Sequence, residues 1–259
     1  MSYSLSLDRF AGKVAVVTGA SSGIGKAIVE GLVKYGVTVA GLARRVERIE
    51  AHAKELAGAK GKLQPYKTDL TKKDEIISIF DKIKKDLGPI HILVNNAGLL
   101  LASNIIDGDI EKWEIVLNTN VLAVSICIRE AVASMKANNI KGHIININSV
   151  AGHDVLDIPG ISVYPASKFA LRALTESVRL EINREKLPIK ITSISPGAVD
   201  TEFSQVAFPA EQLKKLAQVN SSRKSISSED VADSAFYVLA TPEHVNVKEL
   251  TIVPQGAMY

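Results

Sequence analysis

Residues 13–36 read KVAVVTGASSGIGKAIVEGLVKYG, and this stretch decides the fold. Residues 13–18 form a short apolar, β-branched run, which is typical of a strand buried on both faces. A glycine-rich turn follows at once, and residues 26–35 predict a helix that ends at Gly36. Strand, glycine-rich turn and helix in this order form a phosphate-binding site, because glycines admit a pyrophosphate and the helix N-terminus supplies N–H donors. The spacing is GxxxGxG rather than the commoner GxGxxG, and the predicted contacts are Gly19, Ser21, Ser22, Gly23, Ile24 and Gly25.

The end of the next predicted strand, residues 38–43, points to the type of dinucleotide. An enzyme that prefers NAD carries an acidic residue there to hold the ribose 2′-hydroxyl. This chain has Arg44 and Arg45 instead, and a guanidinium can pair with a 2′-phosphate through its forked donors. We therefore predict NADP(H) as the cofactor. The alternative is that one or both arginines are solvated residues at a helix start.

A third predicted strand covers residues 63–67 and is followed by Asp69 and Leu70. A carboxylate there can meet the adenine amino group, although Asp69 can equally cap the helix predicted over residues 74–87. Residues 90–94 predict a fourth buried strand, which ends at the turn Asn95–Gly98. Further apolar strands are predicted to end at Ser149, over residues 189–195 and over residues 247–253.

Candidate acid–base chemistry lies in the segment 149–168, SVAGHDVLDIPGISVYPASK. Tyr164 and Lys168 are four residues apart, which places both side chains on one face of a helix. An ammonium group near a phenol lowers the pKa of the phenol towards neutrality, so Tyr164 could donate or accept a proton. The hydroxyl of Ser149, at the end of an apolar run, would point to the same place. A YxxxK pair alone usually marks only an exposed helical pair, so the prediction depends on the rest of the chain.

The motifs together resemble those of the short-chain dehydrogenase/reductase family over nearly the whole length. In order they are Thr18-Gly19-xxx-Gly23-Ile24-Gly25, Asn95–Gly98, Asn120 in LNTNVLA, Ser149, Tyr164-xxx-Lys168 and Pro196-Gly197. Three stretches also look like the branch of insect farnesol dehydrogenases and their vertebrate cytosolic relatives: GLARRVERIE, NVLAVSICIREAVASM and GHIININSVAGH. The expected fold is a single-domain, doubly wound parallel sheet of about seven strands with helices on both faces.

The resemblance implies a role for each motif. Tyr164 is the general acid/base, Lys168 lowers its pKa and contacts the nicotinamide ribose, and Ser149 binds the substrate oxygen. Asn120 would hold a water that joins Lys168 to solvent, or else it caps the helix predicted over residues 121–135. The remaining implied cofactor contacts are Asn96, Ala97, Gly98, Pro196, Gly197, Val199 and Thr201; Pro196-Gly197 can alternatively be an ordinary turn.

The apolar segment between Ser149 and Tyr164 predicts a substrate wall, although such a loop can also be a subunit contact or plain core. The predicted substrate contacts are Ser149, Val150, Val155, Tyr164 and Phe203, and likeness to the family suggests a mobile lid over residues 210–218. The expected substrate is a farnesol-like terpenoid alcohol, and a steroid or general carbonyl reductase is the alternative. A catalytically silent NADP(H)-binding protein is the rival from another class. We interpret the adjacent His153 and Asp154 as polar loop groups.

Composition limits the remaining possibilities. The 259 residues suit one domain, with a cofactor half over about residues 10–150 and a catalytic half over about 150–259. The net charge of +3 predicts no nucleic-acid surface, and we expect no signal peptide, no bilayer-spanning run and a cytoplasmic location. The single cysteine, Cys127, is predicted to be a buried small hydrophobe. The histidines show no metal-binding spacing, so no metal is predicted. Likeness to the family predicts a homodimer or homotetramer through residues 121–135 and 165–185.

Overall fold

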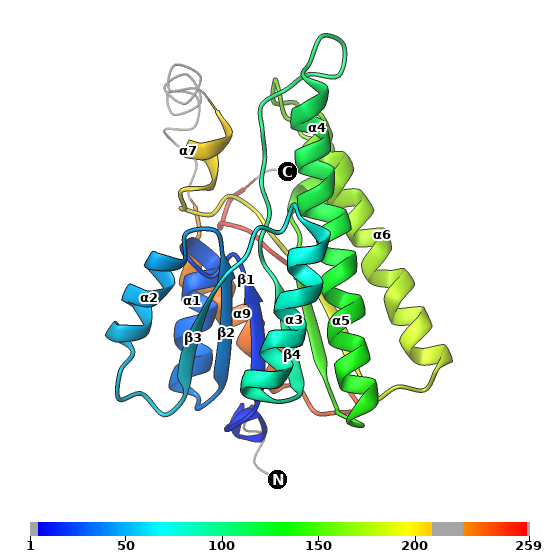
Figure 1. Ribbon diagram of the computed structural model, residues 1–259. Helices are drawn as coiled ribbons and strands as arrows, with labels where there is room; N and C mark the ends of the chain where they lie inside the picture. The colour runs from blue at the N-terminus through cyan, green and yellow to red at the C-terminus, as the bar shows by residue number, and fades with distance from the viewer. Residues whose placement is uncertain (1–4, 209–224, 258–259) are drawn as a thin grey trace.

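Seven parallel strands form one sheet in the order β3-β2-β1-β4-β5-β6-β7 in the computed structural model, which describes residues 5–208 and 225–257 (Figure 1). Every neighbouring pair is parallel. The strands are β1 (Val14–Thr18), β2 (Thr38–Ala43), β3 (Lys62–Lys67), β4 (Ile90–Asn95), β5 (His143–Ile147), β6 (Lys190–Pro196) and β7 (Glu249–Ile252). The predicted single doubly wound sheet is confirmed.

Helices cover both faces of the sheet (Figure 1). One face packs against α1 (Gly23–Lys34), α2 (Val46–Glu55) and α9 (Ser228–Ala240). The other packs against α3 (Lys73–Leu87), α5 (Ala123–Ala137) and α6 (Val163–Arg184). The remaining helical elements are η1 (Asp8–Phe10), α4 (Ile110–Leu117), η2 (Asn118–Leu122), η3 (Val150–Gly152) and α7 (Phe203–Ala207). This layering buries both faces of the sheet, as the continuous apolar strands require.

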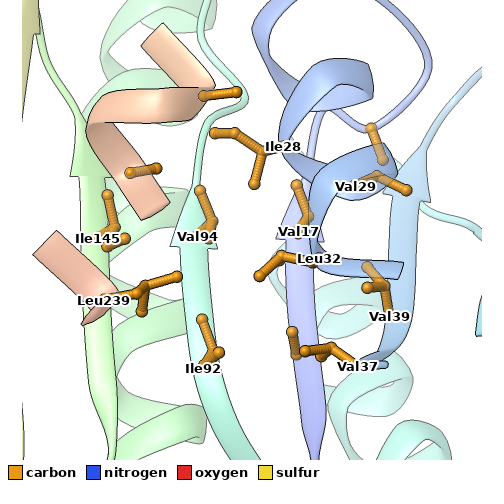
Figure 2. Close-up of a cluster of buried hydrophobic side chains, with 14 of the residues drawn as sticks. Val17, Ile28, Val29, Leu32, Val37, Val39, Ile92, Val94, Ile145 and Leu239 are labelled. Atoms are coloured by element: carbon orange, nitrogen blue, oxygen red, sulfur yellow. The ribbon is translucent and has the colours of Figure 1, made fainter. Parts of the chain in front are cut away.

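The core is divided between the two faces by the alternation of side chains along each strand. In β1, Ala15 and Val17 belong to the cluster under α1 and α9, whereas Val14 and Val16 belong to the cluster under α3 and α5. Figure 2 shows Val17 beside Ile28 and Leu32 of α1. Each fully buried side chain of this size contributes roughly 1.5–3 kcal/mol of transfer free energy, so β1 is fixed in the centre of the sheet.

The region from residue 110 to residue 137 differs from the prediction. A helix was expected over 121–135, but the chain is already helical from Ile110 and passes through the π-helical turn η2 before α5 begins. This stretch also corrects the expectation that nothing is long and apolar enough to span a bilayer. Ile110–Ala137 passes that test by length and composition, with a mean hydropathy of 1.5, and half of its most apolar window is buried. Cys127 and Met135 of α5 contribute to this apolar character from within the core.

The start of α9 and the environment of the cysteine are both well defined. Ser227 caps α9, since its side chain accepts from the Asp230 N–H while the Asp230 carboxylate accepts from the Ser227 N–H. Cys127 is buried as expected, and burial raises the pKa of its thiol to about 12. The expected lid over residues 210–218 lies outside the described residues.

The topology places the candidate site. The strand order reverses between β1 and β4, and ligands of open parallel sheets bind at such a switch point, beyond the carboxyl ends of the strands. Because all strands are parallel, the segments after β1, β4, β5 and β6 meet at this one edge.

Candidate functional site

The glycine-rich turn after β1 is held close to the turn after β4. Gly19 has a φ of +66°, and a Cβ there would lie 2.9 Å from Asn96 Nδ2. A Cβ on Gly25 would overlap the Gly19 carbonyl oxygen, so only glycine fits this approach between turn and helix. Gly23 has a φ of +54°, which also favours glycine. The predicted glycines are therefore required by the backbone itself.

Asn96 ties the two turns together. Its side-chain Nδ2 donates to the carbonyl oxygens of Thr18 at 2.9 Å and Gly19 at 3.2 Å. The Thr18 hydroxyl in turn accepts from the N–H groups of Asn96 and Ala97, each at 3.0 Å. The Asn96 side chain is thus occupied within the protein, and it preorganises the glycine-rich turn.

A dinucleotide fits this turn. Helix α1 begins at Gly23, its N-cap Ser22 makes no side-chain capping bond, and its first turn carries no acidic residue. The first N–H groups of the helix and its partial positive charge are therefore available to a pyrophosphate. Ser21, Ser22 and Gly23 line a cavity of about 450 Å³ together with residues of α2 and of the segment after β6. Ile24 packs partly against the core and holds the helix on the sheet.

The residues after β2 and β3 divide into free and engaged groups. Arg44 is exposed and makes no hydrogen bond or ion pair to any described residue, whereas Arg45 bonds to Ser22 and Glu202. The Asp69 carboxylate accepts from the N–H and the hydroxyl of Thr71, at 3.0 and 2.8 Å. Its pKa is lowered, because these bonds and the nearby charge of Arg44 outweigh desolvation. Asp69 thus caps the turn before α3 instead of the helix itself, and Leu70 packs against the core.

Tyr164 and Lys168 lie together near the start of α6. The Lys168 Nζ is 5.7 Å from the centroid of the Tyr164 ring, and it donates to the Ile147 carbonyl oxygen at 3.0 Å. Desolvation by burial lowers the pKa of Lys168 to about 8. Burial raises the pKa of Tyr164 to about 12, and a hydrogen bond to Ser149 opposes this only in part. The expected lowering of the phenol pKa is therefore absent here, because Lys168 does not touch the hydroxyl and desolvation prevails.

Ser149 and Phe203 approach the same tyrosine from different elements. Ser149 follows β5 and caps the short helix η3, with its hydroxyl accepting from the Ala151 N–H at 3.1 Å. The ring of Phe203, at the start of α7, lies 5.8 Å from that of Tyr164. Val150 is buried in η3, whereas Val155 is 79% exposed.

Asn120 is buried in the π-helical turn η2. Its Oδ1 accepts from the Leu99 N–H at 2.9 Å, and its Nδ2 donates to the Leu99 carbonyl and the Ser167 hydroxyl. Its side chain therefore braces the segment after Gly98 against α6, and it does not cap α5. A Cβ on Gly98 would lie 3.5 Å from Asn120 Oδ1 and 3.7 Å from Lys168 Nζ, so the three predicted motifs meet.

The segment after β6 reaches back to the glycine-rich turn. Gly197 donates to Ile252 at 2.8 Å, and Val199 forms an isolated bridge with Ile226, which fixes the backbone beyond Pro196. A Cβ on Gly23 would lie 3.2 Å from the Thr201 side chain, so Thr201 sits against the start of α1. The predicted contacts from the two halves of the chain are thus brought together.

A second polar cluster lies behind Ser149. The His153 Nε2 is 3.0 Å from the Ser195 hydroxyl and 3.5 Å from the Glu249 carboxylate. The composition is that of a hydrolytic triad, but Ser195 is fully buried and also contacts Glu249 directly, at 2.7 Å. The cluster therefore ties the η3 segment to β6 and β7 and offers no nucleophile. His153 is a polar loop group, as predicted, with a defined partner.

Two charged residues at this edge were missed in the sequence. Arg48 and Glu202 both line the cavity at α1, and they bond to each other at 3.0 Å. Arg48 lies one helical turn after Arg44 and Arg45, which was the available signal; nothing local marks Glu202. Within the described ranges, no three His, Cys, Asp or Glu side chains group as a metal site.

Comparison with known proteins agrees with this geometry. Residues 13–212 match the family model described as short chain dehydrogenase. The chain is 44% identical to a farnesol dehydrogenase of Aedes aegypti over 98% of this chain and 100% of the relative. It is 43% identical to dehydrogenase/reductase SDR family member 11 of Gallus gallus over 96% and 98%. Among solved structures it resembles a serine dehydrogenase complexed with NADP⁺ (TM-score 0.85, 30% identity, covering 95% and 96%). It also resembles a Burkholderia phymatum enzyme in complex with NAD (TM-score 0.81, 26% identity, covering 94% and 89%).

Proposed function

Because the chain belongs to the short-chain dehydrogenase/reductase family, we propose that it is an NADP(H)-dependent enzyme that interconverts an apolar alcohol and its carbonyl. A farnesol-like terpenoid alcohol is the proposed substrate. The observation that carries the proposal is the meeting of Tyr164, Lys168 and Ser149 beside the glycine-rich turn. A silent binding protein would not need these three groups at one point.

The proposed catalytic residues handle the proton and the charge on the substrate oxygen. Bound NADP(H) would supply or accept the hydride. In the reductive direction the Tyr164 hydroxyl, protonated at neutral pH since its pKa is about 12, donates its proton to the carbonyl oxygen. Ser149 donates a hydrogen bond to the same oxygen and stabilises its developing charge.

Lys168 acts through charge. With a pKa of about 8 it is largely protonated at neutral pH, and its ammonium group stabilises the phenolate that Tyr164 becomes after donating. Asn120 would keep the turn after β4 in register with α6, through its bonds to Leu99 and Ser167. We propose that it also borders the path by which the proton is replaced.

The choice of NADP(H) rests on the arginines after β2. Arg44 is an exposed guanidinium that makes no hydrogen bond or ion pair to the described residues, at the position where the adenosine ribose would lie in this fold. The solved relative with NADP⁺ supports the proposal, although another solved relative holds NAD. A 2′-phosphate would give Arg44 a bidentate partner.

An apolar substrate is supported by the surroundings of Tyr164. Leu100, Ile161 and Ala207 form a small buried cluster, against which Leu156, Ile158, Tyr164 and Phe208 pack. Such a wall would suit an isoprenoid chain, and the relative from Aedes aegypti bears the name farnesol dehydrogenase. The second candidate, a steroid or general carbonyl reductase, is supported by the vertebrate relative's name, dehydrogenase/reductase.

The experiment is a substrate panel under both cofactors. Pure protein is mixed with NADP⁺ or NAD⁺ and farnesol, other long-chain alcohols and hydroxysteroids, and with NADPH and the matching carbonyls. Turnover of farnesol with NADP⁺ supports the first proposal, and turnover of steroids or general carbonyls alone moves the substrate to the second. Tight NADPH binding without any turnover would favour the silent binder. We also propose a cytoplasmic location, which fractionation of cells would test.

A further inference from the structure

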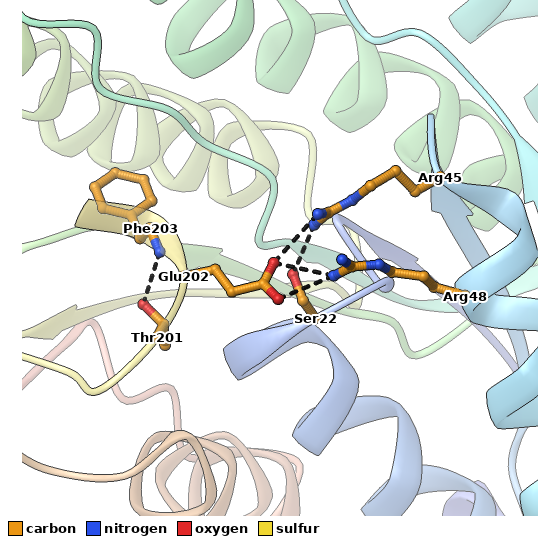
Figure 3. A network of polar contacts seen from close by, with 6 residues as sticks. All are labelled: Ser22, Arg45, Arg48, Thr201, Glu202 and Phe203. Atoms are coloured by element: carbon orange, nitrogen blue, oxygen red, sulfur yellow. Dashed lines mark hydrogen bonds and ion pairs between the residues drawn. The ribbon is translucent and has the colours of Figure 1, made fainter. Parts of the chain in front are cut away.

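A carboxylate lies between two arginines at the edge of the proposed cofactor site (Figure 3). Glu202, which directly precedes α7, bonds to Arg45 Nη1 at 3.2 Å and to Arg48 Nη1 at 3.0 Å through both of its oxygens. Arg45 also donates to the Ser22 hydroxyl at 3.1 Å. The two arms of this network are more than 150 residues apart in the sequence and meet only through the fold.

The network lies where the 2′-phosphate of the cofactor would bind. Ser22 is the N-cap of α1, at the start of the proposed pyrophosphate site, and Arg45 follows β2, whose end faces the adenosine ribose in this fold. The guanidinium of Arg45 therefore links the start of α1 to the end of β2, where the 2′-phosphate carried by the ribose of NADP(H) would be bound. Arg48 and Glu202 line the adjoining cavity.

The ion pairs that Glu202 makes with Arg45 and Arg48 can compete with a bound phosphate, yet they are weak enough for a phosphate to break them. The side chains of Arg45, Arg48 and Glu202 are each between 43% and 45% exposed, and exposed pairs of this kind contribute little net free energy. A phosphate dianion can therefore displace the carboxylate. A ribose hydroxyl carries no charge and therefore does not displace the carboxylate from the arginines.

We propose that Glu202 sets the selectivity between NADP(H) and NAD(H) by competing, as an internal carboxylate, with the 2′-phosphate for Arg45 and Arg48. The inference rests on the proposed function and goes beyond it by naming a residue that holds NADP(H) affinity down. A molecule whose arginines are closed on Glu202 must open before the phosphate binds, so the apparent Kd equals the intrinsic Kd divided by the open fraction.

The test compares Glu202→Gln with Asp200→Asn by fluorescence titration of NADPH and NADH. Both substitutions remove one negative charge from the wall of the same cavity, but the Asp200 carboxylate makes no hydrogen bond or ion pair to any described residue. E202Q is expected to lower the Kd for NADPH by about three- to tenfold and to change the Kd for NADH by less than about twofold. D200N should leave the ratio of the two constants unchanged.

A second probe isolates the phosphate. In competition against NADPH, 2′-AMP should bind E202Q more tightly than wild type, and 5′-AMP should not. R48Q should weaken the binding of 2′-AMP. Adding E202Q to R48Q should improve 2′-AMP binding by a smaller factor than E202Q does in the wild-type background. An unchanged ratio in E202Q, an equal gain for both cofactors, or weaker NADPH binding would each overturn the inference while leaving the proposed function in place. Failure of the wild-type protein to bind either dinucleotide would overturn both.

Discussion

Burial shifts the pKa values of two side chains at the carboxyl edge of the sheet, and a third side chain there stays exposed. Tyr164 is held neutral with a pKa of about 12, while the pKa of Lys168 is lowered to about 8. Arg44 is an exposed cation that makes no hydrogen bond or ion pair in the described part of the chain. A neutral Tyr164 can donate a proton, and an exposed Arg44 can bind an anion. The state of each of these side chains can be tested by a measurement.

Replacing Arg44 with Asp tests the cofactor. R44D removes the free guanidinium and places a carboxylate near the ribose, where it would accept from a 2′-hydroxyl and repel a 2′-phosphate. The KM for NADP(H) should rise on the order of a hundredfold or more, and that for NAD(H) should rise far less. Steady-state kinetics with both cofactors measures this, with exposed Lys54→Asp of α2 as the control for charge alone. An equal rise for both cofactors would remove Arg44 from phosphate recognition.

The buried Lys168 should make stability depend on pH. An unfolded lysine keeps its proton up to its ordinary pKa of 10.5, whereas folded Lys168 releases it near 8. Between these values the unfolded state binds more protons, so the free energy of unfolding rises with pH. From pH 7.5 to 9.5 wild type should gain about 2 kcal/mol more than Lys168→Met.

Urea unfolding of both proteins at the two pH values measures this difference. Lys190, whose pKa burial also lowers to about 8, is present in both proteins and cancels. In K168M the Ile147 carbonyl loses the hydrogen bond from Lys168, but the free-energy cost of that loss is the same at both pH values and does not affect the difference between them. Parallel gains in wild type and K168M would show that Lys168 keeps an ordinary pKa.

At the scale of elements, the contact between α1 and α9 depends on a glycine. A Cβ on Gly31 of α1 would overlap the ring of Phe236 of α9, which also packs edge-on against Tyr35 at 5.7 Å. The absence of a side chain at Gly31 is what allows α9 to pack against the outer face of α1. Residues of α9, α1 and β1 share one core cluster, so this contact indirectly stabilises the glycine-rich turn between β1 and α1.

Gly31→Ala should therefore destabilise the protein, although alanine favours a helix more than glycine does. The clash should cost about 1–3 kcal/mol, which exceeds the propensity gain of about 1 kcal/mol. In a Phe236→Leu background the same substitution should become neutral or stabilising, since the ring is gone. Denaturant unfolding of the four proteins gives the result, and an equal effect of G31A in both backgrounds would refute the contact.

Sequence patterns predicted most elements but missed how some of them join. Buried strands such as β1 and β2 were predictable because their residues are apolar without interruption and end at glycine or arginine. Helix α4 and the π turn at Asn120 were not, because Val116 is the only buried residue of α4, so the segment carries no continuous buried stripe. Asp69 was left between two roles; its carboxylate bonds to Thr71 in the turn before α3 and does not cap the helix, and its contact with adenine stays a prediction. The position of Glu202 in the site could not be predicted from the sequence, because only the fold brings it to Arg45 and Arg48.

At the scale of the whole molecule, the outer face of the α4–α5–α6 layer remains apolar. Ile115, Leu117, Leu122, Phe169 and Leu180 are each between 38% and 51% exposed. These positions fall on or next to the two long helices that the sequence predicted as a subunit contact. We expect two or four chains to associate through this layer.

Light scattering after size exclusion tests the association. The mass should be two or four times that of one chain, and Phe169→Asp with Leu180→Asp should reduce it. Ile106→Asp is the matched control, since Ile106 is 99% exposed in the loop before α4. A single-chain mass for wild type at micromolar concentration would contradict the proposed interface.

The central claim is that Tyr164 moves the proton while the bound nucleotide moves the hydride. The most direct measurement follows the absorbance of reduced nicotinamide as wild type and Tyr164→Phe act on farnesol with NADP⁺, beside titrations of NADPH binding. Phenylalanine keeps the ring and its contact with Phe203 but removes the hydroxyl. The account predicts a loss of turnover of at least about 10²–10⁴-fold in Y164F, with the Kd for NADPH changed only a few-fold. Undiminished turnover in Y164F would contradict it.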